Sequence, residues 1–122
     1  MILIDTSIWA DHFRSRDATL DLLLVSGRAM IHPYVIGELA VGYLRERDTT
    51  LSMLGALPRP KLPREGDLLA FIDRAGIDGS GLGFVDASLL ASCSLARNVW
   101  LWSRDKKLVA KAVTLELAWQ PA

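Results

Sequence analysis

The chain begins with a short apolar run that ends at a carboxylate, and this stretch constrains the fold more than any other. Residues 2–4 read Ile-Leu-Ile, a run that is too short for a helix and typical of a strand buried on both faces of a parallel sheet. Asp5 follows directly, and Thr6 and Ser7 are residue types that favour the start of a helix. Because open α/β sheets bind their ligands at the carboxyl ends of strands, Asp5 lies at a candidate binding edge.

Strands and helices alternate along the remaining residues. Expected strands cover residues 2–4, 29–32, 98–102 and 113–119, and the proline-rich stretch 58–63 could hold a further edge strand. Helices are expected over residues 17–25, 49–57, 64–75 and 84–96. Three further helices are expected to start after Asp5, at Pro33 and after Ser103, which is expected to be a cap. The glycine-rich stretch 76–83 is expected to be a loop. This alternation predicts an α/β fold with a central, mainly parallel sheet flanked by helices. The 122 residues fit one domain spanning 1–122.

The composition narrows the class of protein. Cys93 is the only cysteine, so no internal disulfide forms, and a buried thiol suits a reducing cytoplasm. We expect neither a signal peptide nor a membrane span, because no stretch has the required length and apolar character. Hydrophobic residues make up 51% of the chain and the mean hydropathy is +0.25, so we expect a partner subunit to cover some apolar surface.

The charge balance gives no overall attraction for nucleic acid. Lys plus Arg and Asp plus Glu number 14 each, so the formal net charge is zero. Binding to nucleic acid would therefore depend on a local basic patch. The side chains available for a patch are Arg14, Arg16, Arg104, Lys106, Lys107 and Lys111, each of which is also explained as part of a solvated helix face.

Four of the acids stand out by their surroundings. Glu38 and Asp86 lie on apolar predicted helices with no cation three or four residues away, and an ionised carboxylate among apolar groups is costly unless it is paired or bound to metal. Asp5 and Asp105 each follow a strand, near the start of a helix. Structural roles remain open as well. Asp5 can cap a helix, Asp86 and Asp105 can lie in a first helical turn, and Glu38 can pair with a distant arginine.

The joint placement of these acids favours a metal site. Two of them end parallel strands at the same edge of the sheet, and two lie on helices that can pack over that edge. Like charges gathered there repel, so a divalent cation is the natural compensation. Oxygen ligands favour Mg²⁺, with Mn²⁺ as an alternative, whereas His12 and His32 lack the companions that zinc needs.

The chain resembles the PIN-domain ribonucleases, and most closely the VapC-type toxins of bacterial toxin–antitoxin pairs. Four stretches carry the resemblance, in order over nearly the full length. They are Ile4-Asp5-Thr6-Ser7-Ile8-Trp9, Ile36-Gly37-Glu38-Leu39, Phe84-Val85-Asp86-Ala87 and Leu101-Trp102-Ser103-Arg104-Asp105-Lys106-Lys107-Leu108. The resemblance implies a three-layer PIN-like fold whose mainly parallel sheet has four to five strands.

The resemblance also implies an activity and a set of site residues. The acidic quartet is Asp5, Glu38, Asp86 and Asp105, and Ser7 and Ser103 match the small hydroxyl positions that assist the acids or water. The implied reaction is Mg²⁺-dependent hydrolysis of RNA phosphodiester bonds by an endoribonuclease toxin, which needs no nucleophile from the chain. The implied partners are an RNA substrate, a cognate antitoxin protein and a second copy of the chain.

Two other functions remain open. A phosphohydrolase or phospho-acceptor domain would use Asp5 as a nucleophile, although many such sites carry an acid two residues later, where this chain has Ser7. A non-enzymatic α/β interaction module would use the acids only to cap helices and to pair with arginines. A response of stability to Mg²⁺ or Mn²⁺ separates this last function from a metal enzyme.

Overall fold

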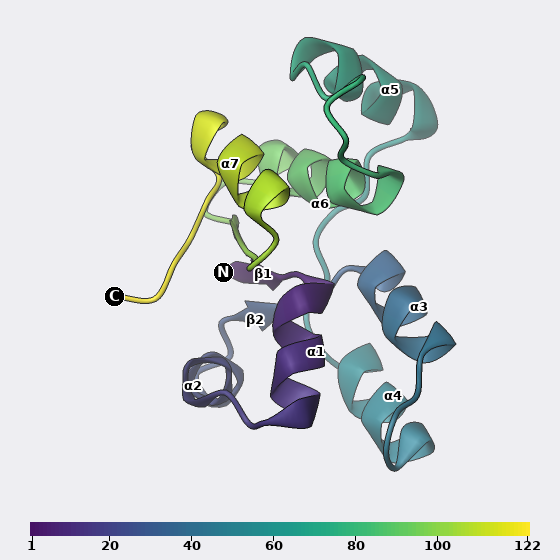
Figure 1. Ribbon diagram of the computed structural model, residues 1–122, viewed down its shortest axis with the longest axis vertical. Coiled ribbons are helices and arrows are strands. Elements are labelled where there is room, and N and C mark those ends of the chain that lie inside the picture. Colours follow the sequence, from purple (N-terminus) through teal and green to yellow (C-terminus); the bar gives the residue numbers. More distant parts are fainter.

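The computed structural model describes residues 1–122 and contains one three-stranded parallel sheet with the strand order β2-β1-β3 (Figure 1). Its strands are β1 (Ile2–Ile4), β2 (Ala29–Met30) and β3 (Trp100–Trp102). The central strand pairs Ile2 with Ala29 on one side and Ile4 with Trp102 on the other. The first apolar run is thus the middle strand, and all three of its residues are fully buried, as expected.

Seven helices flank the sheet. They are α1 (Thr6–Arg14), α2 (Ala18–Val25), α3 (Pro33–Val41), α4 (Arg47–Gly55), α5 (Glu65–Arg74), α6 (Phe84–Leu95) and α7 (Lys106–Thr114). Figure 1 shows α5, α6 and α7 grouped on one side of the sheet and α1 to α4 on the other. Helix α6 packs on β3, α2 packs on β2, and α1 packs on α3, which confirms the predicted α/β fold with a parallel sheet between helices. None of these helices has the length and apolar character that a membrane crossing requires.

The core is built around the sheet and two tryptophans. Trp9 and Trp102 are almost completely buried, and burial of large apolar side chains is the main stabilising contribution in a domain of this size. Helix α6 contributes a run of buried residues from Ala87 to Cys93. Burial raises the pKa of the Cys93 thiol to about 12, so this cysteine is an inert core residue, as the sequence predicted.

The prediction of four to five strands is wrong, because two expected edge strands do not form. Residues 58–63 contain no strand. Their one backbone hydrogen bond near the sheet is accepted by the Pro58 carbonyl from the amide of Ile31, which follows β2, at 2.9 Å. Prolines lack the amide donors that a ladder needs. The expected strand 113–119 is instead the end of α7 followed by one isolated parallel bridge between Ala118 and Leu101.

Several element boundaries also differ from the predictions. The expected strand 29–32 stops at Met30, because His32 already caps α3 by accepting from the Tyr34 amide at 3.0 Å. The expected strand 98–102 begins at Trp100, since Asn98 has a positive φ of 62°. The helix expected over 49–57 spans Arg47–Gly55. These differences in element boundaries do not change the predicted position of Asp5 at the carboxyl end of β1.

Candidate active site

Strand pairing brings Asp5 and Ser103 together at one edge of the sheet. Ile4 at the end of β1 pairs with Trp102 at the end of β3, and the Asp5 amide donates to the Trp102 carbonyl at 3.0 Å. Asp5 and Ser103 are therefore neighbours across two parallel strands, although 98 residues separate them. Both are buried, with Asp5 only 6% exposed.

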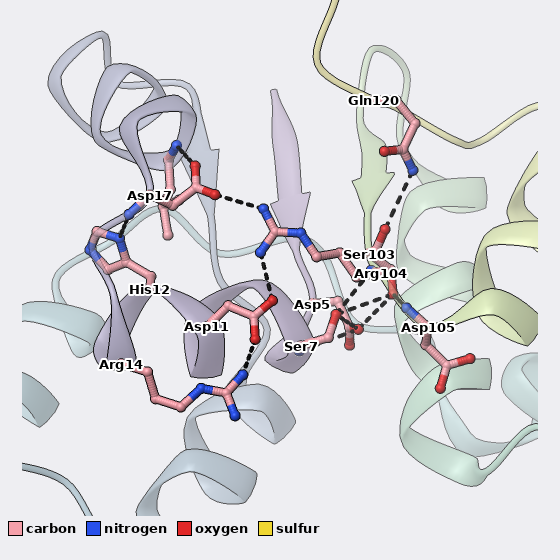
Figure 2. Close-up of polar contacts among 11 residues, drawn as sticks. Asp5, Ser7, Asp11, His12, Arg14, Asp17, Ser103, Arg104, Asp105 and Gln120 are labelled. Atoms are coloured by element: carbon pink, nitrogen blue, oxygen red, sulfur yellow. Dashed lines mark hydrogen bonds and ion pairs between the residues drawn. The ribbon is translucent and has the colours of Figure 1, made fainter.

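Two serine hydroxyls converge on a single carboxylate oxygen of Asp5 (Figure 2). Ser7 Oγ and Ser103 Oγ each lie 2.7 Å from Asp5 Oδ2, and both donate to it. The two hydroxyls are 3.4 Å apart, and the Ser7 amide adds a longer contact of 3.4 Å to the same oxygen. Hydrogen bonds to an ionised oxygen are stronger than neutral ones and fix its orientation. Asp5 Oδ1 receives no hydrogen bond from the protein, so it is the oxygen available to a ligand.

Ser103 does not cap α7, which corrects the prediction from the sequence. Asp105 is the cap, because its Oδ1 accepts from the Leu108 amide at 3.0 Å. The Ser103 hydroxyl instead accepts from the Asp105 amide at 3.0 Å while it donates to Asp5. One buried serine thus connects the two acids that follow β1 and β3.

The other two acids come from helices. Glu38 lies on α3, and its Oε1 accepts from Thr6 Oγ1 at 2.6 Å. Glu38 is exposed, and none of the ion pairs in the structure includes it, so it does not pair with a distant arginine. Asp86 lies in the first turn of α6, where its Oδ2 accepts from the Gly83 amide at 3.1 Å.

Three of the four acids also perform the structural roles that the sequence left open. Asp5 and Asp105 cap α1 and α7, and Asp86 reaches back to the amide that precedes α6. Each role occupies one carboxylate oxygen, as does the contact of Glu38 with Thr6. The second oxygen of every one of the four carboxylates receives no hydrogen bond from the protein. Helix capping and cation binding are therefore compatible in each residue.

The electrostatics place the four acids in one field. Burial raises the pKa of Asp86, and the charges of Asp5, Asp105 and Glu38 raise it further, against the lowering effect of the Gly83 amide. As the side chains lie, however, no three His, Cys, Asp or Glu side chains are close enough to hold one ion between them. The four acids thus interact through their charges but do not form a closed ligand set.

The donor set fits a hard divalent cation in spite of this spacing. All four groups offer a free carboxylate oxygen, and oxygen ligands suit Mg²⁺ and Mn²⁺. Mg²⁺ keeps several of its waters and is commonly held by only one or two carboxylates, so the remaining acids can face it across water. The negative charges of the neighbouring acids raise the pKa of Asp86, and a bound divalent cation would offset their repulsion.

The comparisons with known proteins decide the family. The chain is 44% identical over 110 residues to Ribonuclease VapC32 of Mycobacterium tuberculosis, in sequences from two strains. The match covers 90% of this chain and 89% of the relative. The chain belongs to the VapC-type PIN-domain ribonucleases. A scan against family models finds no match, so the membership rests on this similarity.

A groove lies beside one member of the acidic quartet, Glu38. An open groove of about 860 Å³ has Thr6 and Glu38 in its lining. Three arginines, Arg14, Arg16 and Arg45, also line it. Two of these arginines belong to the expected basic patch, whereas Arg104 and the three lysines of α7 lie outside this lining. Of the four acids, only Glu38 lines this groove.

The sequence did not reveal two contributors to the site. Thr6 was interpreted only as a helix-start residue, but it holds Glu38. Arg104 was assigned to a solvated helix face, but its amide donates to Ser7 Oγ at 3.1 Å and its guanidinium bonds to two aspartates. The only signal in the sequence is that both residues lie inside the stretches that resemble the family.

Proposed function

We propose that this protein is a metal-dependent endoribonuclease that hydrolyses RNA phosphodiester bonds, with Mg²⁺ as its cofactor and Mn²⁺ as a functional substitute. The observation that carries the proposal is the 44% identity, over 90% of the chain, to a protein named as a ribonuclease. The site geometry supports it, because each of the four carboxylates has a free oxygen, and the charges of the other three acids act on Asp86.

The proposed roles follow from the position of each side chain. Asp5 and Asp86 are the firmest ligands, since Asp5 is buried, Asp86 is half-buried, and both are held by local donors. Glu38 contributes directly or through water, and Asp105 binds or acts behind the other ligands. Ser7 and Ser103 keep Asp5 Oδ1 directed toward the ligand. When bound, the cation supplies the Lewis acidity that activates a water and stabilises the leaving oxygen.

We further propose an antitoxin partner, a homodimer and a cytoplasmic location. Several large apolar side chains are almost fully exposed, including Val25 at 89%, Val41 at 92% and Tyr43 at 90%. Such exposure is typical of surfaces that a protein partner covers. Light scattering over a wide concentration range tests the dimer, and a monomer at every concentration would contradict it.

The activity is tested by cleavage of RNA with Mg²⁺, with EDTA and with the Asp5→Asn variant. We expect cleavage only by the wild-type protein with metal. Asp73→Asn is the matched control, because Asp73 is an exposed aspartate on α5 with no ion pair. Equal cleavage in EDTA and by Asp5→Asn would refute the proposal.

The two rival functions are less well supported. Ser7 occupies the position where many phospho-acceptor domains have a second acid, and its hydroxyl donates to Asp5 instead. A purely structural role for the acids predicts no change of thermal stability with Mn²⁺, whereas a native-state metal ligand raises it.

A further inference from the structure

Arg104 lies between Ser103 and Asp105, and its guanidinium joins three separate elements (Figure 2). Its Nη1 donates to Asp11 Oδ2 at 2.7 Å and its Nη2 donates to Asp17 Oδ2 at 2.6 Å. The same group lies 5.5 Å from the centre of the Trp102 ring. A guanidinium with two carboxylate partners and an aromatic face is strongly restricted in orientation.

The acceptors of Arg104 are themselves held in place. Asp17 caps α2, because its second oxygen accepts from the Leu20 amide at 2.9 Å, and its own amide donates to His12 Nδ1 at 2.9 Å. Asp11 lies on α1, and the hydrogen bond from Arg104 is the main cause of its lowered pKa. The guanidinium thus ties helix α1 and the start of α2 to the segment that follows β3.

The backbone of the same residue reaches the carboxylate at the centre of the site. The Arg104 amide donates to Ser7 Oγ at 3.1 Å, and Ser7 Oγ donates to Asp5 Oδ2 at 2.7 Å. Ser103 donates to the same oxygen from the other side. A shift of the Arg104 segment relative to α1 would separate these two hydroxyls, which belong to different elements. The guanidinium itself contacts none of the four candidate ligands.

We propose that Arg104 is a positioning residue, whose bridge to Asp11 and Asp17 holds Ser7 and Ser103 on one oxygen of Asp5 and so presents the other oxygen to a divalent cation. The inference rests on the proposed metal-dependent function. It assigns a role to a side chain that lies outside the acidic quartet.

Simple electrostatics makes the opposite prediction, which allows a clear test. Arg104 carries a positive charge beside the site, so its removal should strengthen cation binding if charge alone matters. If positioning dominates, its removal weakens binding, because partners behind metal ligands typically change affinity by at least about tenfold. The sign of the change therefore separates the two explanations.

The experiment measures Mn²⁺ binding by calorimetry on the whole protein without RNA. Arg104→Met keeps the length of the aliphatic stem and removes the donors, and we expect about tenfold weaker binding. The double variant Asp11→Ala and Asp17→Asn removes the acceptors, because alanine has no side-chain oxygen and the single Asn oxygen at residue 17 is used to cap α2. Adding Arg104→Met to this double variant should weaken binding no further. Arg16→Met is the matched control, because Arg16 pairs with Asp21 and has no contact with the serines.

The outcomes are distinct from those of the proposed function. Unchanged or tighter Mn²⁺ binding by Arg104→Met, with binding lost in Asp5→Asn, would overturn the positioning role and leave the metal-dependent function intact. No saturable Mn²⁺ binding by the wild-type protein, together with metal-independent cleavage, would overturn both. If Arg104→Met does not fold, Arg104→Lys and the double aspartate variant decide by the same criterion, since Lys cannot form the two-armed bridge. At saturating Mn²⁺ a folded Arg104→Met enzyme should recover its kcat.

Discussion

Replacement of two buried serines by alanine should have different effects on stability. Ser103 is 2% exposed, and its hydroxyl donates to Asp5 at 2.7 Å and accepts from the Asp105 amide at 3.0 Å. Ser92 on α6 is 0% exposed, and its hydroxyl has no hydrogen-bond partner. The substitution removes the same atom at both positions, so the difference between the variants reports the hydrogen bonds.

The magnitudes follow from the partners of each hydroxyl. A hydrogen bond to a charged group contributes about 1.5–3 kcal/mol and a neutral one about 0.5–1.5 kcal/mol, so Ser103→Ala should lower the free energy of unfolding by about 2–4.5 kcal/mol. For a chain of this length the loss corresponds to about 10 °C in Tm. Ser92→Ala removes an unpaired polar group and places a better helix former in α6, so stability should stay equal or rise by up to about 1 kcal/mol.

Urea and thermal unfolding, followed by tryptophan fluorescence in EDTA, measure both variants. EDTA is needed because a bound cation would add its own stabilisation and could mask the difference. Equal destabilisation of Ser103→Ala and Ser92→Ala would refute the reasoning, since it would mean that the contacts of Ser103 with the two acids contribute nothing net. A large loss only in Ser103→Ala supports the view that this serine locks the Asp5 edge.

Three further perturbations test other parts of the fold. Burial, and then the neighbouring carboxylates, raise the pKa of Asp86, so its ionised form destabilises the metal-free protein. Asp86→Asn should therefore raise Tm in EDTA at pH 7. This gain in Tm should vanish as the pH falls through the pKa of Asp86 in the folded protein, because the wild-type carboxylate is then protonated. Burial lowers the pKa of His32 from 6.5 to about 4, so between these two pH values only the unfolded chain binds the proton. As the pH falls through this range, the free energy of unfolding of the wild-type protein should fall by about 3 kcal/mol. His32→Asn should not show this loss. Gly81 has a φ of +87°, and an added Cβ would lie 2.8 Å from the flexible end of Lys107, so Gly81→Ala should lower the free energy of unfolding by about 1–2 kcal/mol. An added Cβ at Gly55 meets nothing within 4 Å, so Gly55→Ala should raise the free energy of unfolding by about 0.5–1 kcal/mol.

Each of these predictions has a result that contradicts it. For Asp86, a Tm in EDTA that falls with the substitution would mean that the carboxylate field is not destabilising. Parallel pH profiles of the wild-type protein and His32→Asn would show that this histidine titrates normally. Equal losses at Gly81 and Gly55 would show that the positive φ at residue 81 has no energetic role. All three are read from thermal unfolding curves.

The sequence by itself determined the features that depend on local pattern and burial. An apolar run of three residues followed by Asp5 predicted a strand buried on both faces and placed Asp5 at its carboxyl end, because a strand without polar residues must be covered on both faces. The acidic quartet also came from the sequence, and its role as a metal site stays a prediction.

Other features depend on contacts between distant residues, which no local pattern encodes. The edge strands expected at 58–63 and 113–119 failed because pairing needs free donors and a neighbouring strand, and these are set by the packed chain. Ser103 could not be recognised as a donor to Asp5, because a serine before a helix normally caps it and the partner lies 98 residues away. The bridge from Arg104 to Asp11 and Asp17 spans 93 and 87 residues. Such polar contacts form only when β1 and β3 lie side by side, so the tertiary structure alone decided how the acids are held.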